Sequence, residues 1–226
     1  MSSAEKTNSV LGVFDNIANE YVKYFGEDWE FINEIQEFAA QLPEKAKVLD
    51  LGCGSGYITN YLHNQNLNAI GLDFSQEMIN IAKEKYPTID FLLADFVNIQ
   101  NYFDENSVDA LIAVYSLYFV PKEQFESVLK SLSKVLKNDG KFFFVTQIGN
   151  GEDYITTPLM EENNVNEKLY VNYYNKEELE TILNRCNFEI EYLKAKYDYD
   201  EKEVSNSGRY IVLAKNKKKV IEIYTK

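Results

Sequence analysis

Histidine and cysteine are nearly absent from this chain of 226 residues, which has one histidine and two cysteines. A nucleophile activated by histidine could be built only on His63, which falls near the end of an expected helix and is interpreted as a surface residue. A metal site with several histidines is excluded. Cys53 and Cys186 form no CxxC pair, so the sequence predicts no disulfide framework and no metal, and reduced thiols indicate a cytoplasmic protein.

Long apolar runs and an excess of positive charge are also missing. No stretch approaches the roughly 20 apolar residues of a membrane helix, and the first ten residues lack a secretory pattern. With 23 basic and 36 acidic residues the net charge is −13, which disfavours nucleic acid or anionic lipid as a partner. The apolar share of 45% is enough for a sizeable core. We expect one globular domain over residues 1–226 and leave its oligomeric state open.

Short apolar runs alternate with amphipathic stretches along most of the chain. The runs are near-continuously apolar, as in strands that are covered on both faces. Expected strands are 48–51, 69–72, 91–94, 108–115, 141–146, 188–192 and 210–214, and expected helices are 57–64, 76–85, 122–137 and 176–185. This alternation predicts an α/β fold with a parallel, doubly wound sheet and helices on both faces.

Four segments depart from that alternation. Residues 9–42 read as two helices before the first strand, so we expect a helical cap over residues 1–42. Residues 147–175 are polar and show no strong periodicity, and a loop of that length is typical of a cover over a substrate site. The basic run 215–219 is interpreted as a solvated turn, and 219–224 as an edge strand or a tail.

The most informative segment runs from a buried strand into Gly52, Gly54 and Gly56, and then into a helix. Glycines let the backbone turn tightly and let a ligand approach it, while N–H groups at the helix start point at that ligand. The dinucleotide fingerprint GxGxxG would need a glycine at position 57, where the chain has Tyr57. The GxGxG spacing therefore argues against a dinucleotide site.

Three acidic residues mark the carboxyl ends of the first three expected strands: Asp50, Asp73 and Asp95. Open α/β sheets bind ligands at this edge. Asp50 would repel a pyrophosphate but would attract a ligand with an amino group and a sulfonium, as in S-adenosylmethionine. Asp73 can accept hydrogen bonds from ribose hydroxyls. NAD sites also use an acid in this position, so Asp73 by itself does not distinguish the two cofactors. Asp95 can accept the adenine amine while the next backbone N–H, that of Phe96, donates to the ring.

Several segments together resemble class I S-adenosylmethionine-dependent methyltransferases. They are VLDLGCGSGYITNYL, IGLDFSQEMINIAKEKY, LLADF and VLKNDGKFFF, and the resemblance extends from about residue 14 to residue 215. FDNIANEY and YYNKEELETILNRCNFEIEYL resemble the subgroup that acts on small molecules. The resemblance implies a Rossmann-like seven-stranded sheet, mostly parallel, whose last strand at 210–214 is antiparallel.

The resemblance also implies roles for individual residues. Asp50 and Gly52 would serve the methionine part of the cofactor, Asp73 the ribose, and Asp95 with Phe96 the adenine. The full set of cofactor-binding candidates is Tyr21, Asp50, Gly52, Gly54, Gly56, Asp73, Phe74, Met78, Asp95, Phe96 and Ala113. Met78 could equally be a core residue of its helix, and Cys53 is interpreted as a filler of the loop rather than a nucleophile.

No catalytic base stands out, and in-line methyl transfer can proceed by positioning the acceptor and excluding water. Weak catalytic candidates are aromatic residues in segments that could roof the site: Tyr21, Tyr115, Tyr118, Tyr173 and Tyr174, beside Tyr24. The segment after the fourth strand, AVYSLYFVP, departs from the Asn-Pro-Pro-Tyr signature of DNA and glutamine methyltransferases and lacks the carboxylates of a catechol-type metal site. We predict methylation of nitrogen, oxygen or carbon in a small molecule. A protein or tRNA acceptor and a non-catalytic cofactor-binding protein stay open as alternatives.

Overall fold

A seven-stranded sheet forms the centre of the computed structural model, which describes residues 2–25, 30–197 and 208–217. The strand order is β3-β2-β1-β4-β5-β9-β8. The strands are β1 (Lys47–Leu51), β2 (Asn68–Asp73), β3 (Asp90–Leu93), β4 (Val108–Ala113), β5 (Leu136–Gln147), β8 (Phe188–Tyr197) and β9 (Gly208–Asn216). The pairs among β1 to β5 are parallel, and β9 runs antiparallel to both β5 and β8. The predicted fold class is confirmed.

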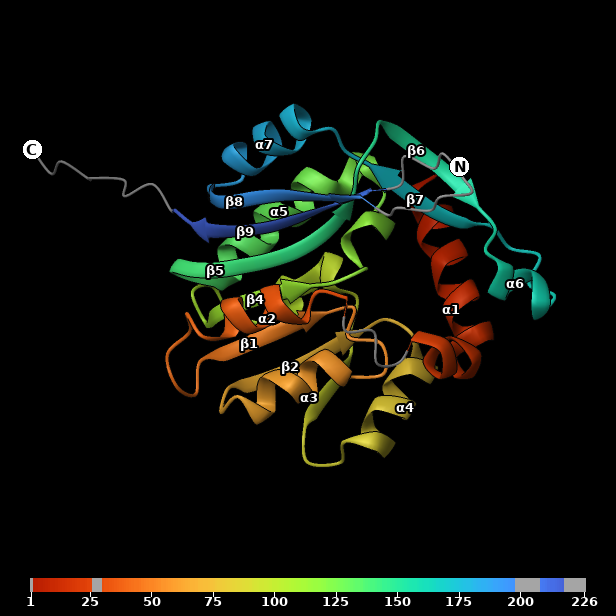
Figure 1. Ribbon diagram of the computed structural model, residues 1–226, viewed down its shortest axis with the longest axis horizontal. Helices are drawn as coiled ribbons and strands as arrows, with labels where there is room; N and C mark the ends of the chain where they lie inside the picture. The colour runs from red at the N-terminus through yellow and green to blue at the C-terminus, as the bar shows by residue number, and fades with distance from the viewer. Residues whose placement is uncertain (1, 26–29, 198–207, 218–226) are drawn as a thin grey trace, which may run out of the picture.

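Helices cover both faces of the sheet (Figure 1). The helices that pack on it are α2 (Ile32–Ala39), α3 (Tyr57–Asn64), α4 (Gln76–Lys85), α5 (Lys122–Val135) and α7 (Lys176–Arg185), with the short 3₁₀ helix η1 (Phe96–Asn101). Three consecutive residues of β5 explain the continuous apolar run. Phe142 and Phe144 pack in the cluster formed with α5 and α7, whereas Phe143 packs in the opposite cluster with α2. Alternate side chains of one strand thus bury themselves in two cores.

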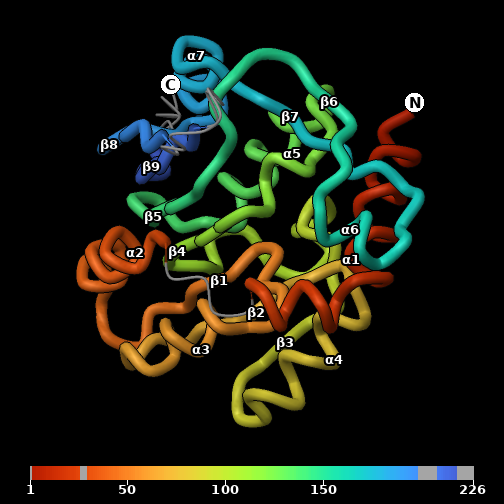
Figure 2. Tube along the Cα trace, turned by 45° about the vertical axis from the view of Figure 1, so that its right-hand side comes forward, coloured from red at the N-terminus to blue at the C-terminus, as the bar shows by residue number. Residues whose placement is uncertain are grey.

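The N-terminal helix and the 147–175 segment pack together at the edge where the parallel strands end (Figures 1 and 2). The elements are α1 (Ser3–Phe25), β6 (Gly151–Ile155), α6 (Pro158–Glu162) and β7 (Leu169–Tyr173), with β6 and β7 forming an antiparallel two-stranded sheet. The prediction of an irregular 147–175 segment is therefore wrong. Its first strand escapes periodicity because Glu152 and Asp153 are exposed in succession, and only the last two residues, Tyr154 and Ile155, are half-buried.

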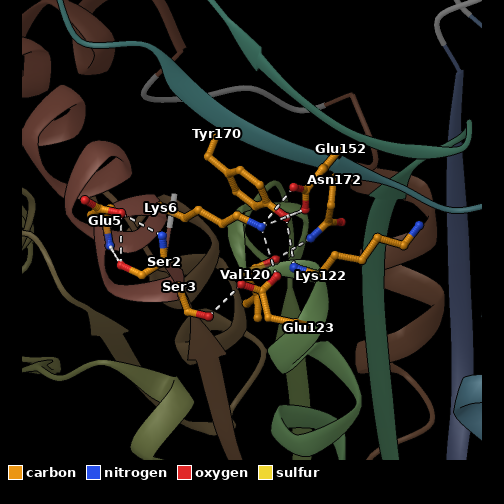
Figure 3. A network of polar contacts seen from close by, with 10 residues as sticks. All are labelled: Ser2, Ser3, Glu5, Lys6, Val120, Lys122, Glu123, Glu152, Tyr170 and Asn172. Atoms are coloured by element: carbon orange, nitrogen blue, oxygen red, sulfur yellow. Dashed lines mark hydrogen bonds and ion pairs between the residues drawn. The ribbon is translucent and has the colours of Figure 1, made fainter.

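A buried lysine ties α1 to the rest of the molecule (Figure 3). The Lys6 ammonium lies 3.0 Å from Glu123 Oε2 in α5 and 2.8 Å from Glu152 Oε2 in β6. It also lies 4.9 Å above the ring of Tyr170, whose hydroxyl donates to Glu152. Burial alone would lower the pKa of Lys6, but hydrogen bonds to Glu152 and Glu123 together outweigh burial and raise it. One cation thus joins three elements that are remote in sequence.

The end of α5 and the end of β9 differ from the prediction. The helix predicted over 122–137 ends at Val135, because Leu136 already pairs with Val108 in the sheet. The run predicted as a solvated turn at 215–219 begins inside β9. There Asn216 is fully buried and its amide donates to the carbonyls of Ser133 and Leu136.

Further differences concern strand bounds. The strand predicted at 188–192 continues to Tyr197 beside β9, and the strand predicted at 108–115 ends at Ala113. The first cap helix begins at Ser3 rather than at residue 9. The predicted strand or tail at 219–224 lies outside the described residues.

Replacing the buried lysine should loosen the contact of α1 with the sheet. In Lys6→Met the glutamates keep their charge without a partner, so we expect the free energy of unfolding to fall by about 1–2 kcal/mol, a modest loss because Glu123 and Glu152 are part-exposed. Lys130→Met removes an exposed ion pair with Glu126 and serves as the control, with no measurable change expected. Chemical denaturation measures both. Equal stability of wild type and Lys6→Met would contradict the assigned role.

Candidate functional site

A cleft opens at the carboxyl ends of β1, β2 and β4, beneath α1. Its empty volume is about 1020 Å³, part of it open to solvent. The glycine loop after β1, the start of η1 and the segment after β4 line it, and α1 closes it from above with residues of one helical face. This is the edge at which open α/β sheets bind ligands.

Asp50, the fourth residue of β1, is 2% exposed and lines the cleft. Its Oδ2 accepts a hydrogen bond of 2.7 Å from the hydroxyl of Thr59 in α3. Burial raises the pKa of Asp50 to about 7, opposed by the bond from Thr59 and reinforced by the nearby charge of Asp73. The carboxylate is thus buried with a neutral hydroxyl donor and faces a cavity, an arrangement that favours a cationic ligand.

Asp73, the last residue of β2, holds the glycine loop in place. Its two oxygens accept 2.9 Å hydrogen bonds from the backbone N–H groups of Gly54 and Ser75. Burial raises the pKa of Asp73 to about 6, although those backbone bonds oppose the change. Ser75 in turn caps α4 through Met78 and donates 2.5 Å to Asp15 of α1. The cap helix is therefore connected to the acid of β2 through one serine.

Asp95 begins η1, where its Oδ1 accepts 2.9 Å from the N–H of Val97. Burial raises the pKa of Asp95, and the bond from Val97 opposes this. Asp95 and the next residue, Phe96, both line the cleft. Three carboxylates from three successive strand ends thus face one cavity.

The glycines of the loop have two different tasks. Gly52 has φ +74° and no room, because a Cβ there would lie 2.5 Å from Cβ of Ser116. Gly54 has φ +52° and nothing within 4 Å of its ideal Cβ position. A side chain at Gly54 would enter the cleft itself, so the open space beside it suits close approach of a ligand to the backbone.

Most residues predicted to bind a cofactor line this cleft. They are Tyr21, Asp50, Gly52, Gly54, Asp73, Phe74, Met78, Asp95 and Phe96, together with the catalytic candidate Tyr115. Met78 both lines the cleft and is buried in α4, so the two readings of this residue are compatible.

The other candidates lie away from the cleft. Gly56 caps α3, where a Cβ would meet the ring of Phe91, and Ala113 is buried in β4.

Three tyrosine candidates also lie elsewhere. Tyr118 packs on Phe119, Tyr173 lies on β7, and the fully buried Tyr174 stacks on Phe125 at 4.5 Å. Tyr24, at 61% exposure, projects from the end of α1.

Sequence reasoning missed several residues of the site. Thr59 was not singled out as the partner of Asp50, although it lies two residues into the helix that follows the loop. The face of α1 with Val10, Phe14 and Phe25 also lines the cleft. Its helical spacing was a usable signal, since these residues fall on one stripe.

Tyr115 adopts φ +60°, a strained conformation for a bulky residue, just beyond the end of β4. Its hydroxyl donates 2.5 Å to Glu30, whose carboxylate also lies 3.1 Å from Lys196 and 3.4 Å from Arg209. Tyr115 therefore presents its ring to the cleft while its hydroxyl is held in an ion-paired cluster outside.

Comparison with known proteins agrees with this site. Residues 48–140, which hold the glycine loop and all three acids, match the model of a methyltransferase domain family. A carboxy-S-adenosyl-L-methionine synthase of Campylobacter hominis is 33% identical over 141 residues, covering 59% of this chain and 58% of that protein. The chain spans between 40% and 59% of the length of four curated relatives that it matches, this synthase included.

Solved structures share the fold at low identity. The 1,6-didemethyltoxoflavin-N1-methyltransferase of Burkholderia thailandensis, solved with its substrate and S-adenosylhomocysteine, has a TM-score of 0.73 at 14% identity and covers 96% of this chain and 92% of its own. A SAM-dependent methyltransferase of Methanosarcina mazei has a TM-score of 0.67 at 21% identity, covering 80% and 98%.

Fold and site together define a Rossmann-like ligand-binding protein with an acidic strand-end cleft. The part of the chain that holds the glycine loop and the three acids matches a methyltransferase domain family, and the fold is similar to that of solved S-adenosylmethionine-dependent methyltransferases. None of the helices in the described ranges combines the length and apolarity needed to cross a membrane.

Neutralising Asp50 should stabilise the ligand-free protein. Its pKa in the folded chain, about 7, lies above the ordinary value of 3.8, so the folded state binds the proton more tightly and loses stability as pH rises between those values. Asp50→Asn should therefore raise the free energy of unfolding near pH 8 by up to about 4 kcal/mol, with little change near pH 4. Denaturation at both pH values measures it. Asp90→Asn, at an exposed position, is the control, and a stability loss in Asp50→Asn near pH 8 would contradict the assignment.

Proposed function

We propose that this protein transfers a methyl group from S-adenosylmethionine to a small molecule. The observation that carries the proposal is the buried carboxylate of Asp50, which faces the cleft with a hydroxyl as its hydrogen-bond donor. A ligand with an amino group and a sulfonium supplies the positive charge that this position favours. The similarity of residues 48–140 to a methyltransferase domain family supports the same donor.

The residues around the cleft fit the separate parts of the donor. Asp50 and the glycine loop suit the methionine part, Asp73 suits the ribose hydroxyls, and Asp95 with Phe96 suits adenine. Each oxygen of Asp73 already accepts one backbone N–H and keeps a lone pair for a hydroxyl. When bound, the donor supplies an electrophilic methyl group on positively charged sulfur. The protein's part is to orient the acceptor in line with that bond and to keep water out.

A small acceptor is favoured over a macromolecule. The cleft lies under α1, and among its described lining residues none is lysine or arginine. With a net charge of −13, attraction of tRNA is disfavoured. The Burkholderia thailandensis protein of the same fold is named for methylation of a small heterocycle, which supports this choice.

Methyl transfer is also favoured over formation of a carboxylated S-adenosylmethionine, which the name of the Campylobacter hominis relative describes. An extra carboxylate would enter a cleft that three acids already line and to which the described lining residues offer no cation. A purified sample denatured with acid should therefore release the plain donor or its demethylated product, and not the carboxylated form.

Calorimetric titration with S-adenosylmethionine, S-adenosylhomocysteine and NAD tests the donor assignment. We expect binding of the first two and none of NAD. In Asp73→Asn the charge-assisted bonds to the ribose are lost, so the affinity should fall by about 1–3 kcal/mol. Asp90→Asn, which is exposed on β3, should bind as wild type does. Unchanged affinity in a folded Asp73→Asn would refute the ribose assignment, and binding of NAD alone would refute the proposed donor.

We further propose that α1 and the 147–175 segment cover the site during reaction. Asp15 and Ser75 connect α1 to the acid of β2, so ligand binding at Asp73 should order the cap. Hydrogen exchange should become slower in residues 9–24 and 147–175 when S-adenosylhomocysteine is added. Unchanged exchange there, with slower exchange in the glycine loop, would restrict the ligand's effect to the sheet edge.

A further inference from the structure

The two halves of the cleft differ in chemistry. The strand-end half carries the carboxylates of Asp50, Asp73 and Asp95. The half formed by α1 and the segment after β4 carries apolar side chains, including Val10, Phe14, Phe25, Phe119, Val120 and Pro121. Since the acids fit the donor, the apolar half is left for the acceptor.

Aromatic rings on this half form a continuous wall. Phe14 lies edge-to-face with Tyr21 at 5.4 Å and with Phe119 of the 3₁₀ helix η2 (Leu117–Phe119) at 5.3 Å. Such a wall suits a flat or apolar molecule, because ring contacts add to the burial of apolar area. The cap helix and the segment after β4 thus shape one surface.

The described lining of this cleft offers an acceptor no cationic side chain. Across the lining that the structure describes there is no lysine, arginine or histidine, and three carboxylates lie opposite. An anionic acceptor would be desolvated without a partner and repelled by the acids. The acceptor half therefore selects an uncharged molecule.

A base that could deprotonate an alcohol is also missing from the described acceptor half. The polar side chains there are those of Thr7, Tyr21, Tyr115 and Ser116, and none of them is a carboxylate or an imidazole. Tyr115 donates to Glu30, and that carboxylate is ion-paired with Lys196 and Arg209 outside the cleft lining. An oxygen acceptor with a high pKa would keep its proton, whereas a neutral nitrogen already has a free lone pair.

We propose, building on the proposed methyltransferase function, that the acceptor is an uncharged, largely apolar molecule methylated on a neutral nitrogen. The nitrogen lone pair forms the bond to the methyl carbon as the carbon–sulfur bond breaks, and that electron pair stays on sulfur as S-adenosylhomocysteine. Positive charge passes from sulfur to nitrogen, so the net charge of the bound molecules does not change in this step. A proton on that nitrogen then leaves to water.

Labelled S-adenosylmethionine tests this proposal with a metabolite extract of cells that make the protein. The extract is first separated by anion exchange, and the unretained part is divided by reversed-phase retention. We expect label in the uncharged, retained fraction, and mass spectrometry of the product should place the methyl group on nitrogen. Label in the anionic fraction, or on oxygen or carbon, overturns this proposal. Label in no small-molecule fraction overturns the proposed function instead.

A new cation in the acceptor half provides a second test. Thr7 lines the cleft from α1, whereas its neighbour Asn8 is exposed and off the cleft. Thr7→Lys should lower labelling of the uncharged acceptor by about tenfold, because the cation loses solvent and meets no partner there. Asn8→Lys adds the same charge on the same helix and should label as wild type does.

Affinity for S-adenosylhomocysteine separates an acceptor effect from damage to the fold. Both lysine variants should keep the wild-type affinity, since Thr7 belongs to the acceptor half. If Thr7→Lys labels the uncharged acceptor as well as Asn8→Lys does while binding S-adenosylhomocysteine normally, the acceptor does not contact this half and the proposal fails.

Discussion

Burial of negative charge at the ends of β1 and β2 is the constraint on which the rest of this structure depends. Asp50 and Asp73 are almost wholly buried and their neighbours are hydrogen-bond donors rather than cations. Such an arrangement costs stability in the empty protein and is offset when a cationic ligand binds. The glycine loop, the Thr59 hydroxyl and the Ser75 cap all serve to hold these two carboxylates in place. Binding specificity and marginal local stability thus have one origin.

The cap is built by joining distant parts of the chain. Lys6 brings the first turn of α1 to Glu123 and Glu152, and Asp15 brings the middle of the same helix to Ser75. These contacts are charged or polar and lie around an apolar cluster that includes Val13. Apolar packing provides affinity between the cap and the sheet, and the polar contacts determine its position, because hydrogen bonds depend strongly on direction. A helix held in this way can form part of a selective acceptor surface.

Sequence patterns predicted the sheet and the strand-end half of the cleft far better than the half formed by α1 and the segment after β4. The strand-end acids could be located because an apolar run marks each strand. The end of the run then marks the sheet edge at which the acid lies. The β6–β7 pair was missed because β6 starts with three exposed residues and does not alternate, so its sequence resembles a loop in periodicity. Tyr174 was misplaced because the sequence around a tyrosine in the 147–175 segment does not show which way its side chain points. In the structure this ring packs on Phe125 and not in the cleft. Ion pairs such as that of Lys6 leave no local signal, since their partners are set by topology.

The position of β9 has a consequence for the order of folding. This strand is inserted between β5 and β8, so the outer edge of β5 stays unpaired until residues 208–216 have been synthesised. An open edge with Phe142, Phe143 and Phe144 is prone to pair with other chains. The buried amide of Asn216 then fastens the end of β9 to the last turn of α5 and the first residue of β5. Completion of the sheet therefore requires long-range pairing, which slows folding and leaves this edge open in the nascent chain.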